Sequence, residues 1–515
     1  MREARGKWLA LAALGLSLLT IGVDATILNV ALPTVGADLG ASTSDLQWFV
    51  DAFTLAMAAL LLPAGLLGDR FGRKKFLMGS LFVFGAASVW CAYSGSSGML
   101  IAARTLLGVS AAFLVPLCTS VLLDIFEDEK ERTKAIGVIA VTQTLGLPLG
   151  PILGGALLNH FWWGSVFLVN APLVALGLVA VALLVPESHG AQRGRIDFTG
   201  VLISSVALIG VVYGSIRAGE EGWGSGEALL PLVGGLVLLV VFGFWEKRVK
   251  RTGEPLVDLG LFRSRGFVWG SVLGTVVAFA MFGLIFALPQ YFQAVDGTDA
   301  LGTGVRLLPL IGGVLVSAGL VSKLATEIAP RAVPALGFLL VAAGLFLGTR
   351  TELATSYGFV ALWLVVAGVG LGLAMTRTMT AAINSLSKER SGVGSALVSA
   401  MRQVGGSVGV AVLGTVANAG YRSHLRLGEV PGEVTEVARR SVGSGVAVGK
   451  KLGSPEIVRA VQDAFVSAMH TLLAVCGVIA VVAAVLALFF MPKRPSGAAA
   501  VEEADREGSV SGTVG

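Results

Sequence analysis

The stretch Gly65-Leu66-Leu67-Gly68-Asp69-Arg70-Phe71-Gly72-Arg73-Lys74-Lys75 decides the fold. It joins two apolar stretches, residues 46–68 and 76–94, each of a length that can cross the roughly 30 Å hydrocarbon core of a bilayer as a helix. Short loops rich in Lys and Arg lie on the cytoplasmic side of a membrane. Because four cations stand within this stretch, it predicts a tight turn between two membrane helices, with all four cations facing the cytoplasm.

The composition of the whole chain agrees with a membrane protein. Of its 515 residues 55% are hydrophobic and 14% are charged, whereas soluble domains are about 25% charged. The mean hydropathy is +0.81. These values exclude a soluble enzyme, a disordered scaffold and a secreted disulfide module as readings of the whole chain. The net charge of +5 does not indicate nucleic acid as a partner, because most Lys and Arg residues stand in short segments between apolar stretches.

Apolar windows recur along the chain and predict an all-α polytopic membrane protein with about fourteen transmembrane helices. Basic residues concentrate in alternate loops, which places both termini in the cytoplasm. We expect a multi-pass protein of a bacterial-type cell (plasma) membrane. The segment at about 420–463 is basic although it falls outside, and we expect an external loop there. The windows are residues 8–31, 46–68, 76–94, 99–123, 135–158, 164–186, 198–216, 228–245, 267–293, 304–322, 333–349, 356–380, 393–419 and 464–491.

The stretch from Gly65 to Lys75 resembles the loop between spans two and three of major facilitator superfamily transporters. Asp69 is the informative residue, since a loop that only sets topology needs the cations alone. The resemblance implies an ion-pair latch at the cytoplasmic side that controls a conformational change. Its members would be Gly65, Asp69, Arg70, Gly72, Arg73 and Lys74.

Two further stretches narrow the resemblance to the fourteen-span drug:proton antiporters of this superfamily, a multidrug and antibiotic efflux type. Residues 24–33 look like the first-span motif of that family. Residues 146–155 are similar to its fifth-span antiporter motif, in which small residues let helix backbones approach and prolines let the helix bend. The motif residues here are Gly146, Gly150, Pro151, Gly154 and Gly155.

The resemblance implies a major facilitator fold, with two six-helix bundles and two inserted helices. Residues 1–190 would form the N-terminal bundle, and residues 191–263 the two inserted helices with a cytoplasmic linker. Residues 264–491 would form the C-terminal bundle, including the external loop. Residues 492–515 would be a disordered cytoplasmic tail, because they are rich in Gly, Ala, Glu and Ser.

Charged residues inside membrane spans are functional candidates because burying them is costly. Asp24, Asp51 and Arg104 all fall roughly 8–11 Å below the outer surface, counting about 1.5 Å per helical residue. We expect Asp24 to carry a coupling proton beside Arg104, with Asp51 assisting or contacting substrate. The alternative is a structural ion pair. Asn29, Gln143 and Gln293 are candidates for a polar cavity lining, or equally for hydrogen bonds between helices.

These observations predict a proton-coupled exporter of a small hydrophobic molecule such as a drug, an antibiotic or a secondary metabolite, working by alternating access. Alternatives are an exporter of an endogenous lipid, amino acid or metabolite, and a membrane sensor that does not transport. No catalytic cluster, metal-ligand spacing or ATP-binding loop occurs in the sequence. We therefore expect no enzyme activity, no metal and no cofactor, the proton gradient being the energy source. The expected partners are the lipid bilayer, the substrate and protons. A monomer suffices, and the sequence leaves the oligomeric state open.

Overall fold

The structure is a computed structural model, and within its described residues the chain folds into helices without any strand. The described residues are 2–41, 43–189, 197–252, 256–257, 259–327, 331–386, 391–427 and 430–492. In chain order the elements are α1 (Arg2–Leu39), α2 (Thr43–Phe71), α3 (Arg73–Ala92), α4 (Ser97–Ile125), α5 (Glu129–His160), α6 (Ser165–Leu168), α7 (Asn170–Leu184), α8 (Phe198–Glu221), α9 (Gly226–Thr252), η1 (Leu259–Arg263), α10 (Arg265–Ala294), α11 (Ala300–Arg306), α12 (Leu308–Glu327), α13 (Ala332–Gly348), α14 (Tyr357–Asn384), α15 (Ser391–His424), α16 (Gly432–Arg440), α17 (Val442–Lys451) and α18 (Pro455–Phe490).

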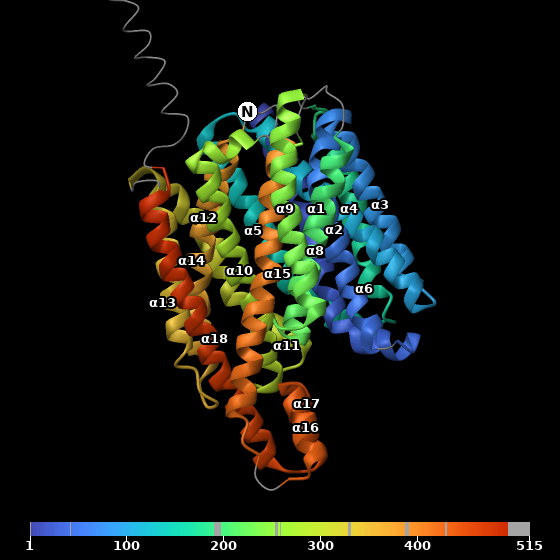
Figure 1. Ribbon diagram of the computed structural model, residues 1–515, viewed down its shortest axis with the longest axis vertical. Coiled ribbons are helices and arrows are strands. Elements are labelled where there is room, and N and C mark those ends of the chain that lie inside the picture. Colours follow the sequence, from blue (N-terminus) through green and yellow to red (C-terminus); the bar gives the residue numbers. More distant parts are fainter. Residues whose placement is uncertain are drawn as a thin grey trace, which may run out of the picture.

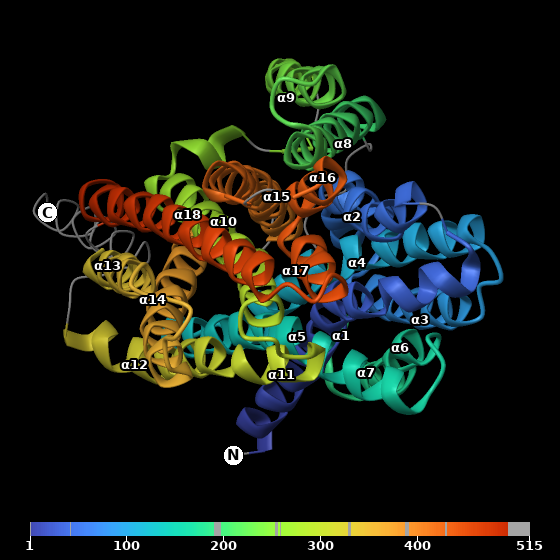
Figure 2. The same ribbon diagram turned by 90° about the horizontal axis from the view of Figure 1, so that it is seen from below.

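The helices form two bundles that lie side by side (Figures 1 and 2). Helices α1–α7 form the N-terminal bundle, and α10–α15 with α18 form the C-terminal bundle. The pair α8 and α9 stands outside both, against α2 and α15. Below, the end of the molecule that carries Arg73 is called the Arg73 end, and the opposite end is called the α16–α17 end (Figure 1).

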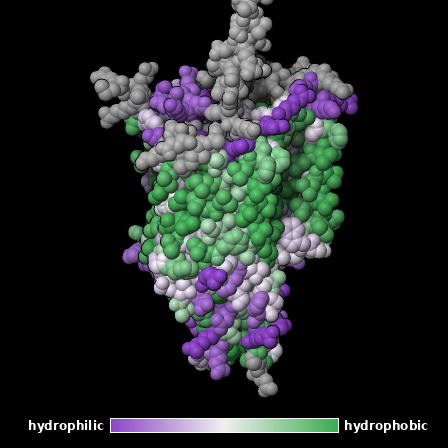
Figure 3. Space-filling view, turned by 90° about the vertical axis from the view of Figure 1, so that its left-hand side faces the viewer, coloured by the Kyte–Doolittle hydropathy of each residue, from purple (hydrophilic) through white to green (hydrophobic). Residues whose placement is uncertain are grey.

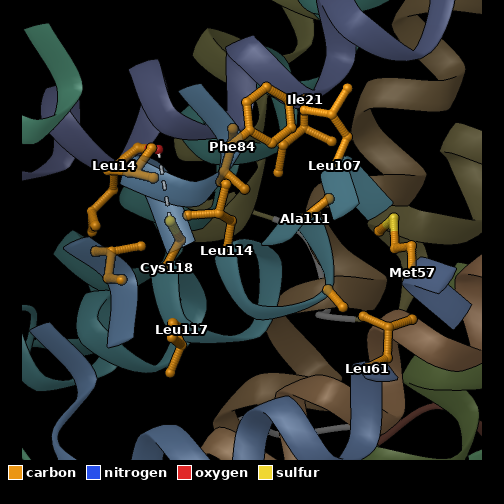
Figure 4. Close-up of a cluster of buried hydrophobic side chains, with 14 of the residues drawn as sticks. Leu14, Ile21, Met57, Leu61, Phe84, Leu107, Ala111, Leu114, Leu117 and Cys118 are labelled. Carbon is orange, nitrogen blue, oxygen red and sulfur yellow. Dashed lines mark hydrogen bonds between the residues drawn. The ribbon is translucent and has the colours of Figure 1, made fainter. Parts of the chain in front are cut away.

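Two large apolar clusters fill the molecule, one made mainly of N-terminal bundle side chains and one mainly of C-terminal bundle side chains, and each includes side chains of the other bundle. In the N-terminal bundle, Leu14 and Ile21 of α1 face Leu107, Leu114 and Cys118 of α4, and the Cys118 thiol donates to the Leu14 carbonyl over 3.9 Å (Figure 4). All five side chains are buried. Side chains that interdigitate in this way keep the bundle rigid, so it can move as a unit.

Twelve helices in the described part of the chain are long and apolar enough to cross a membrane. All fourteen predicted windows overlap helices, yet the predicted number of spans is not reproduced. Helix α13 is apolar but has only 17 residues, and α5 includes side chains outside the described part. The surface carries an apolar belt with hydrophilic residues at both ends (Figure 3), as a protein embedded in a bilayer requires.

The segment at 420–463, expected as an external loop, is largely helical. It contains the end of α15 and the whole of α16 and α17, and α18 begins at Pro455 rather than near residue 464. Hydropathy windows find only apolar helices, whereas α16 is short and mostly polar on its exposed side. This helical segment stands at one end of the molecule (Figure 1). The predicted tail falls outside the described residues from residue 493 onward.

Candidate functional site

The turn between α2 and α3 consists of Gly72 alone, because α2 ends at Phe71 and α3 begins at Arg73. Gly72 has φ +115°, a conformation that residues with a Cβ rarely adopt. A Cβ here would also lie 2.9 Å from Glu187 Oε1. Gly65 and Asp69 are therefore residues of helix α2 rather than of a loop, and both are buried.

Arg73 is not exposed, as a cation that faces the cytoplasm from a loop was expected to be, because its side chain is fully buried. Its Nε donates to Asp69 Oδ1 over 2.8 Å, and its Nη1 donates to Asp124 Oδ2 over 2.6 Å. Two carboxylates compensate for the loss of water around the guanidinium, which a buried cation requires. Asp124 lies near the end of α4. The sequence analysis did not identify it as a partner of Arg73, because a carboxylate at the end of a membrane helix is common.

The cations beside Arg73 have different roles. The Lys74 backbone N–H donates to Glu187 Oε1 over 3.0 Å, and Lys74 Nζ donates to the Ala182 carbonyl over 2.8 Å. Arg70 is partly exposed and lies over the Phe71 ring. The start of α3 is thus fixed to the end of α7, and the six predicted latch residues lie together at the Arg73 end.

Asp24 and Arg104 form an ion pair in the interior of the N-terminal bundle. Arg104 Nη1 donates to Asp24 Oδ2 over 2.5 Å. The side chain of Arg104 is 2% exposed and that of Asp24 is 0% exposed. Arg104 Nε also donates to the Phe49 carbonyl of α2 over 2.8 Å, and its guanidinium lies over the Phe53 ring. One arginine therefore joins α1, α2 and α4.

The second oxygen of Asp24 is also occupied, by a residue to which the sequence gave no role. Asn170 Nδ2 donates to Asp24 Oδ1 over 2.9 Å and to Ser88 Oγ over 3.2 Å. Asn170 and Ser88 are both fully buried. A search for charged residues in spans cannot find such neutral partners. An asparagine within an apolar span was the available signal.

The glycines of the fifth-span motif pack α5 directly on α1. A Cβ at Gly146 would lie 2.6 Å from Gly22 Cα, and one at Gly150 would lie 2.8 Å from the Ile27 backbone nitrogen. Gly154 continues the contact one turn later, against Ile27. Pro151 is half-buried and Gly155 is buried in the same helix. Close backbone packing, as predicted for this motif, is what the geometry displays.

A cavity of about 720 Å³ lies between the bundles, toward the α16–α17 end. Helices α1 and α2 line it from one bundle, and α10, α15 and α18 line it from the other, together with α8 and α17. Most of the lining is apolar. The polar lining side chains are Thr26, Asn29, Asp51, Thr54, Ser215, Gln290, Gln403, Ser407, Asn418, Tyr421 and Ser441.

The remaining candidates are divided by this cavity. Asn29 and Asp51 line it, whereas Asp24 is buried within the N-terminal bundle beside Arg104. Gln293 is exposed near the end of α10 and does not line the cavity; Gln290 lines it instead. The lining residues of α10 end at Gln290, and Gln293 lies nearly one helical turn beyond it, one residue before the end of α10. The side chain of Gln143 lies outside the described part.

The bundles touch at the Arg73 end of the cavity. Ser395 Oγ of α15 donates to the Pro116 carbonyl of α4 over 3.2 Å and lies 3.3 Å from Ser120 Oγ. A Cβ at Gly137 of α5 would lie 3.3 Å from Thr376 Cγ2 of α14. These contacts separate the cavity from the Arg73 end.

The comparisons with known proteins agree with this architecture. The model of the Major Facilitator Superfamily matches residues 14–410, most of the chain. The chain belongs to the major facilitator superfamily. The fold predicted from the sequence, an all-α membrane protein of this superfamily, is thereby confirmed.

Relatives within the superfamily are resistance and efflux proteins. The chain is 34% identical to the multidrug efflux pump LfrA of Mycolicibacterium smegmatis, over 86% of this chain and 88% of LfrA. It is 31% identical to the tetracenomycin C resistance and export protein of Streptomyces glaucescens, over 95% and 93% of the two chains. It is 32% identical to the puromycin resistance protein of Streptomyces alboniger, over 81% and 83%.

Two solved structures share the superfamily fold at low identity. A bacterial homologue of the human lysosomal transporter Spinster, in an inward-facing and unoccupied conformation, has a TM-score of 0.57 at 17% identity, covering 94% of this chain and 96% of that one. The human organic anion transporter MFSD10 has a TM-score of 0.60 at 13% identity, covering 95% and 100%. Both support the two-bundle arrangement.

Proposed function

We propose that the protein is a proton-coupled antiporter that exports small hydrophobic molecules, such as drugs, antibiotics or secondary metabolites, by alternating access. The observation that carries the proposal is the ion pair of Asp24 and Arg104, sealed from water beside the wall of the cavity. Buried charges in membrane spans serve transport more often than stability. The names of the related efflux and resistance proteins support export as the direction of transport.

The coupling follows from how the ion pair is connected. Protonation of Asp24 removes its negative charge and weakens its attraction to Arg104. Arg104 also holds the Phe49 carbonyl of α2. Ala25 follows Asp24 on α1 and Val50 follows Phe49 on α2, and both line the cavity. A proton on Asp24 thus changes the two helices that form the N-terminal wall of the cavity, so that proton and cargo compete for one conformation.

The cavity indicates the class of cargo. Its volume suits a small organic molecule, and pockets of this kind bind through apolar area with a few oriented polar groups. Among the described lining residues Asp51 is a carboxylate, and Asn29, Gln290 and Gln403 offer amides. This set fits neutral or singly charged amphipathic compounds. In the proposal both termini and the Arg73 end face the cytoplasm, and the cavity lies toward the outside.

The test is export in proteoliposomes with an imposed pH gradient, using ethidium and puromycin as probes. Asp24→Asn keeps the size of the side chain and removes the titrating oxygen, so we expect correct membrane insertion without proton-driven export. Asp463→Asn, which makes the same change at an exposed carboxylate of α18 outside the cavity lining, is the control and should keep proton-driven export. Undiminished export by the Asp24 variant would refute the assignment, and absence of export by the unaltered chain for a wide compound panel would refute the function.

A further inference from the structure

Arg402 of α15 is a cation within a membrane span that has no carboxylate partner among the described residues. Its Nη1 donates to Met379 Sδ of α14 over 3.9 Å, and a thioether sulfur is a weak acceptor. By contrast, Arg73 is paired with two carboxylates and Arg104 with one. Arg402 follows Val393, where the apolar span of α15 begins, by nine residues, which places it about 14 Å along the helix in a hydrocarbon core of roughly 30 Å. A charge at this depth is costly and is therefore a functional candidate.

The guanidinium of Arg402 lies on the side of the C-terminal bundle that faces the N-terminal bundle. Helix α10 lies between α14 and α15 (Figure 2), so the contact of Arg402 with Met379 passes across α10. Met379 is buried in the apolar cluster made mainly of N-terminal bundle side chains, which places this contact on the interface side of α10. Ala400, two residues before Arg402 on α15, belongs to the same cluster. The charge therefore stands where the two bundles meet.

Along α15, Arg402 stands between the closed contact of the bundles and the cavity. Ser395, which contacts Ser120 of α4, precedes Arg402 by seven residues, and Gly406, which lines the cavity, follows it by four. Both spacings keep the three side-chain positions on one side of the helix. Among the described residues that line the cavity, Gln403 is present and Arg402 is not. If the bundles separated at Ser395, the cavity would extend past Arg402.

The chemistry of a guanidinium selects oxygen anions. It presents five N–H donors in a planar fork that can bind a carboxylate through two parallel hydrogen bonds. The contact with Met379 uses one of these donors on a weak acceptor, so the described contacts of Arg402 leave room for a stronger one. The cavity that Arg402 would join is mostly apolar. A molecule with an apolar body and one carboxylate fits such a combination.

We propose that Arg402 binds the carboxylate of hydrophobic organic acids when the bundles part at the Arg73 end, and that closure of this end, as in the present structure, withdraws the guanidinium from the cavity. This inference rests on the proposed export function and adds an anionic class to its cargo. In the orientation proposed above, such cargo is held more tightly from the cytoplasm than from the outside. A difference in affinity between the two states favours loading inside and release outside.

The experiment compares two probes that differ in one charge, pyrenebutyrate and its neutral amide, pyrenebutyramide. Equilibrium binding of each probe to the purified full chain in detergent is measured by energy transfer from tryptophan to pyrene, and export is measured in proteoliposomes with an imposed pH gradient. The test variants are Arg402→Gln, which removes the charge, and Arg402→Lys, which keeps it. The matched control is Arg422→Gln, the same change at an exposed arginine of α15 outside the cavity lining.

We expect the unaltered chain and the Arg422→Gln variant to bind pyrenebutyrate about tenfold or more tightly than pyrenebutyramide, the effect of one hydrogen bond to a charged group. Arg402→Gln should abolish this preference without weakening the binding of the amide or the export of ethidium, and Arg402→Lys should keep part of it. A preference that is unchanged in Arg402→Gln, or missing in the unaltered chain, overturns the proposal. So does an equal loss of both probes, which a structural role would cause.

The closed contact gives a second test. In a chain whose native cysteines are replaced by alanine, Ser120→Cys with Ser395→Cys holds α4 and α15 together after oxidation. The oxidised chain should bind the two probes equally, and reduction should restore the preference for pyrenebutyrate. A preference that survives complete oxidation overturns the proposed withdrawal of Arg402. Absence of proton-driven export of both probes and of ethidium counts against the proposed function instead, while the binding measurements decide the role of Arg402.

Discussion

Arg73 is held more tightly than any surface cation could be, because both of its carboxylate partners come from the neighbouring helices α2 and α4. Removing one member of such a buried group leaves charges in a medium that solvates them poorly. Arg73 therefore joins three helices at the Arg73 end, and the stability of that end depends on it. Arg70, three residues earlier, is partly exposed and lies over the Phe71 ring.

We predict that Arg73→Gln lowers the free energy of unfolding by about 3–5 kcal/mol, the usual effect of removing one partner of a buried ion pair. Asp69 and Asp124 would then lose the cation they share. The measurement is thermal stability of the purified protein in detergent, with Arg70→Gln as the matched control, for which we expect a loss of less than about 1 kcal/mol because Arg70 is partly exposed. Equal stabilities of the two variants would show that the buried pair does not support the fold.

At the scale of single residues the sequence could identify charges but not their neutral partners. Charged residues within spans are rare, so Asp24 and Arg104 were identifiable, and counting residues from the span ends placed them at one depth. Asn170 and Ser88 are neutral, so a search for charged residues does not find them as partners of Asp24. Asp51 lines the cavity and Asp24 does not. The difference depends on which side of each helix faces the other bundle, and packing between distant segments of the chain determines that side.

The packing of α5 on α1 is the element on which the bundle geometry depends most directly. Where a glycine approaches a backbone atom of the facing helix, no side chain can move aside to make room. Gly150 is such a position, since a Cβ would meet the Ile27 nitrogen at 2.8 Å. Gly79 of α3 offers a contrast, because a Cβ there would meet no atom within 4 Å.

We predict that Gly150→Ala destabilises the protein by about 1–3 kcal/mol, the range for overpacking in a core, and lowers export because α1 is displaced together with Asp24. Gly79→Ala should be neutral or slightly stabilising, since alanine favours a helix by up to about 1 kcal/mol over glycine. Thermal stability and ethidium export are measured for both. A Gly150 variant that matches the Gly79 variant in both measurements would contradict the role assigned to this contact.

At the scale of elements, hydropathy predicted the positions of the helices well, because a membrane helix is apolar over most of its length. It failed for α16 and α17 because these short helices are held by contacts with the ends of α15 and α18. The Tyr421 hydroxyl donates to the Ala438 carbonyl over 2.8 Å, and Gly449 lies against the Val458 backbone. Such contacts require no apolar stretch long enough to cross a membrane, so a hydropathy window does not detect these helices.

At the scale of the whole molecule the two bundles meet in different ways at the two ends of the cavity. At the Arg73 end α4 and α15 are joined through Ser120 and Ser395. Toward the α16–α17 end the space between α2, α8, α10 and α15 remains open as the cavity. The bundles also meet through α5 and α11, where a Cβ at Gly304 would lie 2.4 Å from Ile152 Cγ1. Under the proposed alternating-access mechanism, this structure would be a state that is closed on the Arg73 side. The sequence indicated two bundles but contains no information on which end is closed.

The contact between Ser120 and Ser395 allows this state to be held. Two hydroxyl oxygens 3.3 Å apart make these two positions a suitable place to engineer a disulfide, which requires side chains that approach each other closely. In a chain whose native cysteines are replaced by alanine, we predict that Ser120→Cys with Ser395→Cys forms a disulfide under oxidising conditions and stops ethidium export, because α4 and α15 can no longer separate. Reduction should restore export, and each single cysteine variant should export under both conditions. If export continued after complete oxidation of the pair, opening at the Arg73 end would not be part of the transport cycle.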